Sequence, residues 1–271
     1  MLCKRIPLNP SDDRAYLDTY VVNDRSHLRP AMIVIPGGGY GVVCTEREGE
    51  PIALAYLKED FQCFVLNYRV GRKEDVYPAQ MVDAGRAFLY VKENAADFGI
   101  DPKKIFFVGF SAGGHLAGCM GTMFNEPEVL EALDVEKDAI RPAGVVLSYP
   151  VTTAIGPCHA YSFEKLSGKG FDSIPIEEKR KYSLECNVTD STVPMFLWHT
   201  ATDQLVPVTG TLMLAAALTA HHIPYACYIF PKGPHGVALA NKVTDTSGTG
   251  ASIAEMAEKW VEESVNFMKT L

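Results

Sequence analysis

Strand-length apolar runs alternate with amphipathic stretches through the first half of the chain. Residues 31–35, 62–67 and 105–110 are nearly continuous apolar runs, and such runs are typical of parallel strands that are covered on both faces. Helical patterns lie between them, at 50–58 and 77–98. This alternation predicts a parallel α/β sheet joined by right-handed crossovers.

The second half of the chain continues the same order. It predicts strands at 144–149, 195–199 and 225–230 and helices at 207–220 and 253–268, and a further early strand is expected at 15–22. No internal repeat or linker interrupts this series. We therefore expect residues 1–271 to form a single α/β domain, with a mostly parallel central sheet and helices on both of its faces.

One long stretch, residues 151–193, departs from this regular pattern. It contains Gly156-Pro157, Gly168 and Gly170, followed by a polar, charged segment. The stretch is too long for an ordinary connection within a compact α/β domain. We interpret it as a small lid or cap over the mouth of the site, and a surface excursion with no role in substrate binding is the alternative.

Composition narrows the classes of function. The chain has 271 residues, 47% of them hydrophobic, and a net charge of −8, which disfavours binding to nucleic acid or to anionic membranes. No apolar run is long enough to cross a bilayer, and residues 1–7 lack the apolar core of a signal peptide. Seven cysteines without framework spacing indicate free thiols in a reducing compartment, so we expect a cytoplasmic protein.

A Gly-x-Ser-x-Gly pattern is the main indication of a chemical function in this chain. It occupies Gly109, Ser111 and Gly113, after the apolar run at 105–110 and before a stretch of small residues with helical spacing. A serine raised out of a tight strand-to-helix turn sits in strained backbone, and flanking glycines relieve the clashes. N–H groups at the start of the following helix favour negative charge near the serine. This context predicts a nucleophile rather than an accidental match in a glycine-rich chain.

A serine nucleophile needs a base, and the base needs a carboxylate to orient it. Asp203 and His235 each come just after a predicted strand. Because the carboxyl ends of the strands share one edge of an α/β sheet, we expect both residues to meet Ser111 there. The chain order Ser, Asp, His is also the order that serine hydrolases with this turn use. Asp190 is a weaker alternative to Asp203, since it precedes its strand instead of following it.

Three consecutive glycines follow the apolar run at 31–35. Such a loop lets the backbone approach a ligand closely and turns N–H groups toward it. We expect Gly38 and Gly39, together with Ala112 after the serine, to donate hydrogen bonds to the oxyanion. A flexible loop and a phosphate cradle are the alternatives, although the Lys-Ser/Thr ending of a phosphate-binding loop is absent.

Other side chains near this edge carry weaker indications. Tyr40 and Tyr68 are candidates for binding the substrate, with packing roles as the alternative. His115 and His199 are expected to be buried structural residues close to the site, and the four remaining histidines show no sign of a role. The cysteines and histidines have no zinc-site spacing, so we expect neither a metal nor a cofactor.

Several segments together resemble a known family. They are Pro36–Tyr40, Glu46–Glu50, Asn67–Val70, Tyr77–Gln80, Gly109–Ala117, Asp203–Pro207 and Gly233–Gly236. These segments are similar to those of the acetyl-xylan-esterase-like, BD-FAE-type carboxylesterases, relatives of the hormone-sensitive-lipase group. The resemblance implies an α/β-hydrolase fold. It also implies a catalytic triad and an oxyanion hole, with the triad at Ser111, Asp203 and His235 and the donors at Gly38, Gly39 and Ala112.

The residues and the resemblance together predict a serine carboxylesterase that works through an acyl-enzyme. Short-chain acyl esters such as acetylated sugars are the substrates that the resemblance implies. The same triad would serve an amidase or peptidase, for example a formamidase-like enzyme, and a non-catalytic binding protein of this fold is a third hypothesis. The expected partner is a small-molecule ester, without nucleic acid or membrane, and a homodimer is left open.

Overall fold

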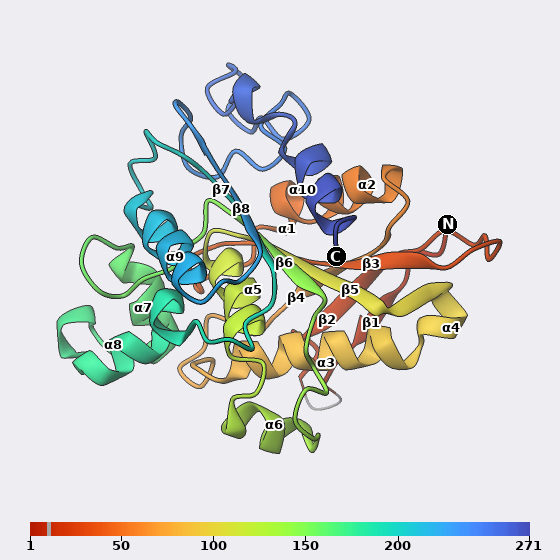
Figure 1. The fold of residues 1–271 in the computed structure, drawn as a ribbon, viewed down its shortest axis with the longest axis horizontal. Helices are drawn as coiled ribbons and strands as arrows, with labels where there is room; N and C mark the ends of the chain where they lie inside the picture. Colours follow the sequence, from red (N-terminus) through yellow and green to blue (C-terminus); the bar gives the residue numbers. More distant parts are fainter. Residues whose placement is uncertain (10–11) are drawn as a thin grey trace.

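An eight-stranded sheet forms the middle layer of the structure, a computed structural model that describes residues 1–9 and 12–271 (Figure 1). Within these residues the strands are β1 (Arg5–Pro7), β2 (Tyr16–Tyr20), β3 (Arg29–Ile35), β4 (Gln62–Asn67), β5 (Ile100–Phe110), β6 (Gly144–Ser148), β7 (Met195–Thr200) and β8 (Tyr225–Phe230). Their order across the sheet is β1-β2-β4-β3-β5-β6-β7-β8. Neighbours from β4 to β8 run parallel, whereas β2 is antiparallel to both β1 and β4. The mostly parallel sheet is therefore confirmed.

Helices cover both faces of this sheet (Figure 1). On one face lie α2 (Glu50–Lys58) and α10 (Trp260–Met268), and on the other α3 (Ala79–Glu93), α5 (Ala112–Thr122) and α9 (Thr209–Ala220). Each face has its own apolar core. The shorter helices are α1 (Thr45–Glu48), α4 (Ala95–Phe98), α6 (Pro127–Leu133), α7 (Ala160–Ser167) and α8 (Ile176–Tyr182), with 3₁₀ turns η1 (Phe171–Ser173), η2 (Leu184–Asn187) and η3 (Glu255–Ala257).

Two predicted helices have different boundaries in the structure. The predicted helix at 77–98 is divided at Asn94 into α3 and α4. The side-chain amide of Asn94 donates to a backbone carbonyl one turn earlier, and such competition weakens a helix interior. The last helix begins at Trp260 rather than at 253, because the N–H of Ala254 is bound to a carbonyl in the loop after β8. β1 and α6 were not predicted, since they are too short to show a periodic pattern.

Residues 151–193 form two short helices and two 3₁₀ turns, α7, η1, α8 and η2, instead of an irregular excursion. Phe163, Leu166 and Leu184 in this stretch are buried and belong to the same core as α3 and α5. The N–H of Tyr77, just before α3, donates to the carbonyl of Leu166 at 2.8 Å. The stretch is therefore docked onto the helices of that face, and its elements were missed because each spans at most eight residues.

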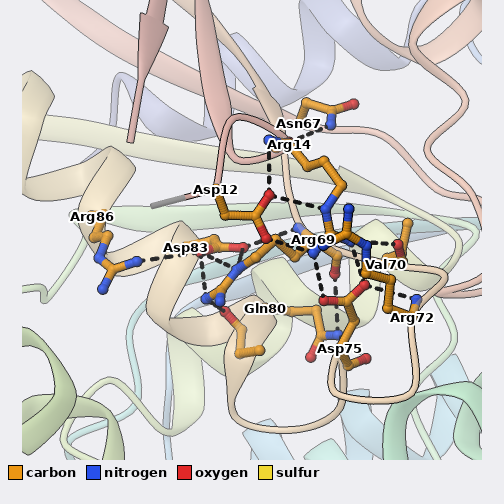
Figure 2. Close-up of polar contacts among 11 residues, drawn as sticks. Asp12, Arg14, Asn67, Arg69, Val70, Arg72, Asp75, Gln80, Asp83 and Arg86 are labelled. Carbon is orange, nitrogen blue, oxygen red and sulfur yellow. Dashed lines mark hydrogen bonds and ion pairs between the residues drawn. The ribbon is translucent and has the colours of Figure 1, made fainter. Parts of the chain in front are cut away.

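A buried ion pair ties the loop after β4 to α3 (Figure 2). The Arg69 guanidinium donates through Nε and Nη2 to the carboxylate of Asp83, with Nη2 2.9 Å from Oδ1. The Asp83 side chain has no exposed surface. Burial raises the pKa of the Asp83 carboxyl above its ordinary value, and Arg69 offsets part of that shift. Arg69 is therefore the main counter-charge of this buried carboxylate, and Arg86 is a more distant one at 3.8 Å.

A second charged group lies beside the first (Figure 2). The guanidinium of Arg14 is 2.5 Å from a carboxylate oxygen of Asp12 and 2.5 Å from one of Asp75. Asp75 also accepts the backbone N–H of Arg72 at 2.8 Å. The loop after β4 is therefore held from inside through Asp75, while the side chains of Arg72 and Lys73 are left at the surface.

Replacing Arg69 by leucine should lower the free energy of unfolding by about 3 kcal/mol, because the buried Asp83 then keeps only the more distant Arg86, at 3.8 Å, as a counter-charge. The double variant Arg69→Leu/Asp83→Leu should regain much of this loss, since it removes both charges. Urea unfolding followed by circular dichroism measures both free energies. Equal destabilisation in the single and the double variant would contradict this account of the pair.

His115 on α5 is buried and links three elements. Its Nε2 lies 2.7 Å from the carbonyl oxygen of Tyr182, and its Nδ1 lies 2.7 Å from the hydroxyl of Tyr40. A carbonyl oxygen only accepts hydrogen bonds, so Nε2 carries the proton and Nδ1 accepts the Tyr40 O–H. Burial lowers the pKa of His115 to about 4, against a smaller opposing effect of the Tyr182 carbonyl. The imidazole is therefore neutral at pH 7, and the structural role expected for it is supported.

The depressed pKa of His115 should make the fold sensitive to acid. The ordinary pKa is 6.5 and the folded value about 4, so between these values the unfolded chain binds more protons and stability falls as pH falls. Lowering the pH from 7 to 5 should cost about 2 kcal/mol through this residue. Urea unfolding at the two pH values should show a smaller loss in His115→Gln. An identical loss in both proteins would rule out His115 as the source.

Candidate active site

Ser111 sits at the sharp turn between β5 and α5, in backbone that a residue with a side chain rarely adopts. Its φ is 55° and its ψ is −117°, which is a strained conformation. The turn is fixed on both sides. The N–H of Ser111 donates to the carbonyl of Ser148 in β6 at 3.1 Å, and a Cβ at Gly109 would lie 2.1 Å from the carbonyl oxygen of Gly113. Only glycine fits that position, which explains this part of the sequence pattern.

Three side chains far apart in the sequence meet at the carboxyl edge of the sheet. The Oγ of Ser111 lies 2.8 Å from Nε2 of His235, and Nδ1 of His235 lies 2.6 Å from Oδ2 of Asp203. These residues follow β5, β8 and β7, as the sequence predicts. An ionised carboxylate only accepts, so Nδ1 carries the proton and Nε2 faces the serine hydroxyl as an acceptor. Asp190, the weaker alternative, instead contacts His221 on the surface at 2.9 Å.

The carboxylate of Asp203 accepts four hydrogen bonds. Oδ1 accepts the backbone N–H groups of Leu205 and Val206 at 2.9 and 3.0 Å, and Oδ2 accepts from His235 and His199. Burial by itself would raise the pKa of Asp203, but the hydrogen bonds from the two histidines outweigh it and hold the pKa well below its usual value. Asp203 therefore stays ionised and fixed in direction at any pH where His235 acts as a base.

His199 is the partner of this site that sequence reasoning left outside the triad. It is fully buried, and its Nε2 lies 3.1 Å from both Oδ2 of Asp203 and the carbonyl oxygen of Val206. Two acceptor oxygens require a proton on Nε2. Nδ1 lies 2.8 Å from the hydroxyl of Thr211 on α9. A histidine at the end of an apolar strand, four residues before the predicted triad aspartate, was the available signal.

The glycine loop after β3 lies directly against the turn at Ser111. A Cβ on Gly37 would come within 2.9 Å of the Cβ of Ser111. Gly38 and Gly39 have φ values of 129° and 65°, which glycine tolerates without strain. Within the described residues, no hydrogen bond occupies the N–H of Gly38 or Gly39. The N–H of Ala112 is at the first position of α5, where helices leave donors free, so the predicted donors remain available beside the serine.

A buried carboxylate connects this loop to the histidine side of the site. Glu48, at the end of α1, accepts the N–H of Gly37 at 2.8 Å and the hydroxyl of Tyr149 at 2.9 Å. The Tyr149 ring packs edge-on against the imidazole of His235, with ring centres 5.1 Å apart. The Tyr149 hydroxyl also accepts the N–H of Ala238 at 3.0 Å, in the loop that carries His235. One side chain therefore supports both the glycine loop and the base.

The nucleophile opens into a cavity of about 260 Å³. Gly38, Gly39 and His235 border it, together with residues that sequence analysis did not select: Arg47, His159, Tyr161 and Leu205. Arg47 belongs to a segment that carries the family resemblance, but nothing in the sequence marked its side chain as part of the site. His159 and Tyr161 lie in the 151–193 stretch, where the pattern gave no basis for choosing single residues.

Tyr40 and Tyr68 do not border this cavity, and their expected role in substrate binding stays a prediction. Both rings are buried, with 1% and 0% of their surface exposed. The hydroxyl of Tyr68 donates to the carbonyl of Pro36 at 2.9 Å, and that of Tyr40 is bound to His115. The two rings pack edge-to-face at 6.1 Å. They support the glycine loop from behind, which is the packing role that the sequence left open.

Two further properties bear on the class of chemistry. In the described ranges, 1–9 and 12–271, no group of three histidine, cysteine or acidic side chains is arranged to hold a metal ion. The helices of these ranges include none that combines the length and apolar character needed to cross a membrane.

Solved structures of esterases have the same fold. An acetyl ester-xyloside bifunctional hydrolase from Caldicellulosiruptor lactoaceticus is 33% identical, with a TM-score of 0.81 over 98% of this chain and 96% of that one. The carboxylesterase Cest-2923 from Lactobacillus plantarum is 26% identical, with a TM-score of 0.87 over 100% and 98% of the two chains. The α/β-hydrolase fold that the resemblance implied is thereby confirmed.

Curated relatives and a family description agree with this fold. An endo-1,4-beta-xylanase B from Butyrivibrio fibrisolvens is 38% identical over 233 residues, 83% of this chain and 35% of that protein. An acetylxylan esterase from Xylanibacter ruminicola is 29% identical over 238 residues, 86% of this chain and 46% of that protein. The chain thus spans between a third and a half of these two relatives. The BD-FAE family description matches residues 17–218, and the chain accordingly belongs to the BD-FAE family of α/β-hydrolase carboxylesterases.

Proposed function

We propose that this chain hydrolyses short-chain acyl esters, acetylated sugars among them, through an acyl-enzyme on Ser111. The observation that carries the proposal is the continuous hydrogen-bond chain from Ser111 through His235 to Asp203, beside backbone donors that no group among the described residues occupies. Membership of a carboxylesterase family supports the ester as substrate. The acetyl group and the sugar are supported by the names of relatives that act as an acetylxylan esterase and an acetyl ester-xyloside hydrolase.

In the acylation step, Nε2 of His235 takes the proton of the Ser111 hydroxyl while Oγ attacks the carbonyl carbon of the ester. The carbonyl oxygen becomes negatively charged, and the N–H groups of Gly38, Gly39 and Ala112 stabilise it. The ester bond then breaks. Its oxygen leaves with the proton held by His235, so the alcohol departs neutral and the acyl group stays on Oγ.

Deacylation repeats these events with water as the nucleophile. Nε2 of His235 takes a proton from water, and the resulting hydroxide equivalent attacks the acyl carbon. The proton then returns to Oγ of Ser111, which leaves as the free hydroxyl, and the acid is released. Through both steps the ionised carboxylate of Asp203 stabilises the positive imidazolium and holds the ring in place.

The surroundings of Ser111 support a small acyl group. The cavity beside the nucleophile measures about 260 Å³, small against the cavities that enclose drug-sized ligands. We further propose that residues 151–193 act as a cap, since this stretch supplies His159 and Tyr161 to the cavity wall. All seven cysteines are free thiols, which favours a reducing compartment such as the cytoplasm as the place of action.

Replacing Ser111 by alanine should lower kcat for p-nitrophenyl acetate by at least about 10³-fold, because the nucleophile is lost while the donors remain. The exposed Ser191→Ala is a matched control and should keep wild-type activity. Rates for p-nitrophenyl acetate and for the corresponding anilide, measured in parallel, separate an esterase from an amidase. Equal rates in wild type and Ser111→Ala, or a preference for the anilide, would overturn the proposal.

Removing His199 should alter the acid–base behaviour of the site. In His199→Leu the carboxylate of Asp203 loses one donor, becomes more basic and stabilises the imidazolium of His235 more strongly. The acid limb of the pH profile of kcat/KM should therefore move to higher pH, and kcat should fall by about 10- to 100-fold as His235 loses its fixed orientation. His199→Gln retains a donor and should lie between wild type and His199→Leu. An unshifted profile in His199→Leu would show that His199 only fills space.

A further inference from the structure

A second cavity adjoins the one that contains Ser111, and Tyr161 borders both. The second cavity has a volume of about 510 Å³. Its walls are the loop after β4, at 71–76, and α7 with the turn that follows it, at 161–170, with Tyr40 and Gly41 between them. A molecule whose ester group is bound at Ser111 can therefore extend past Tyr161 into this second space.

Tyr161 rests on the backbone of the glycine loop at the boundary of the two cavities. A Cβ on Gly41 would lie 2.5 Å from the Tyr161 hydroxyl, and a Cβ on Gly39 would lie 3.0 Å from its ring. Nevertheless 46% of the Tyr161 surface is exposed. An aromatic ring that is held against the backbone and remains partly exposed offers a rigid surface on which a bound molecule can pack.

The second cavity is positively charged. Four cationic side chains and two carboxylates border it: Arg72, Lys73, Lys165 and Lys169, with Asp75 and Glu164. This excess of cations is local, since the chain as a whole carries a net charge of −8. A concave region of one sign raises the local concentration of ligands of the opposite sign.

The two carboxylates leave a net positive charge, because they face four cations and the charge of Asp75 is already paired. Asp75 is held by the guanidinium of Arg14 on its inner side, at 2.5 Å (Figure 2). Glu164 accepts the backbone N–H of Phe171 at 3.1 Å. Neither carboxylate makes an ion pair with a lysine of the cavity in the part of the chain that the structure describes.

Among the residues that the structure describes, three of the four cations form no salt bridge. Lys169 forms an ion pair with Glu178 at 2.5 Å. No salt bridge involves Arg72, Lys73 or Lys165 within residues 1–9 and 12–271, and the Lys165 ammonium lies 5.2 Å from the centre of the Tyr161 ring. These three side chains are exposed and come from both walls of the cavity, so an anion between the walls would be approached from two sides.

We propose that this second cavity binds the carboxylate of an acidic alcohol, so that the enzyme prefers acyl esters of acidic sugars over esters of neutral ones. The inference rests on the proposed function. The acyl group takes the smaller cavity beside Ser111, and the alcohol part extends past Tyr161. The planar guanidinium of Arg72 matches a carboxylate with two parallel N–H donors, while Lys73 and Lys165 act as point charges.

Binding in the second cavity would affect only the acylation step. Both kinds of ester give the same acyl-enzyme on Ser111, and the alcohol, charged or neutral, has then left the second cavity. The preference should therefore appear in kcat/KM, which reports acylation, and be absent from the deacylation rate. This separation distinguishes a subsite for the alcohol from a general change in the catalytic residues.

The test compares methyl glycosides of O-acetylated glucuronic acid and of O-acetylated glucose, which differ in the carboxylate. Wild type should show about a tenfold higher kcat/KM for the acidic ester, equal to about 1.4 kcal/mol, and added salt should reduce this ratio. In Arg72→Gln/Lys165→Gln the ratio should fall to about one. The control Lys58→Gln/Lys137→Gln removes the same charge at exposed positions on α2 and after α6 and should keep the wild-type ratio.

A wild-type ratio near one would overturn the proposal, as would a ratio that survives in Arg72→Gln/Lys165→Gln. Equal loss of the ratio in the Lys58→Gln/Lys137→Gln control would also overturn it, since the effect would then be one of overall charge. Wild-type hydrolysis of p-nitrophenyl acetate separates the two proposals. If that ester is cleaved without any preference among sugars, the subsite alone fails; if no ester is cleaved, the proposed function fails first.

Discussion

The close approach of two backbone turns is the constraint on which the site depends. The turn at Ser111 and the glycine loop after β3 touch so tightly that a Cβ on Gly37 would reach the nucleophile itself. This contact brings free N–H groups beside the serine without any side chain between them. The buried carboxylate of Glu48 holds the arrangement together, because it binds the loop at one oxygen and, through Tyr149, the segment of the base at the other.

Most of the scaffold could be predicted from the sequence because its central strands, β3 to β7, are largely buried on both faces and show as apolar runs. The strands at 62–67 and 225–230 and the helix at 50–58 have the predicted bounds. Short elements of three to eight residues, such as β1, α6, α7 and α8, were not predicted because tertiary contacts, and not a periodic sequence pattern, stabilise them. The break at Asn94 depends on one side-chain hydrogen bond that no periodicity reveals.

The site divides in the same way. The triad could be predicted from the sequence because Ser111, Asp203 and His235 each follow a strand, and a parallel sheet brings the ends of its strands together. His159 and Tyr161 could not be predicted, since their position depends on how the 151–193 stretch docks on α3 and α5. Arg47, in α1, could not be predicted either, because nothing in the sequence shows toward which side of that short helix its side chain points. For Tyr40 and Tyr68, nearness in sequence to the glycine loop did not show on which side of it they lie; the structure buries them behind it.

The dual attachment of Glu48 has a consequence for how such an enzyme can diversify. One carboxylate joins the glycine loop to the segment that carries His235. A change that moves either segment would therefore also disturb the other, so the two segments can change only together. Tyr161 packs on the glycine loop, but neither it nor His159 is hydrogen-bonded to Glu48 in the residues that the structure describes. The walls that would contact the substrate, in the 151–193 stretch and in the loop after β4, can therefore change while the reaction stays the same.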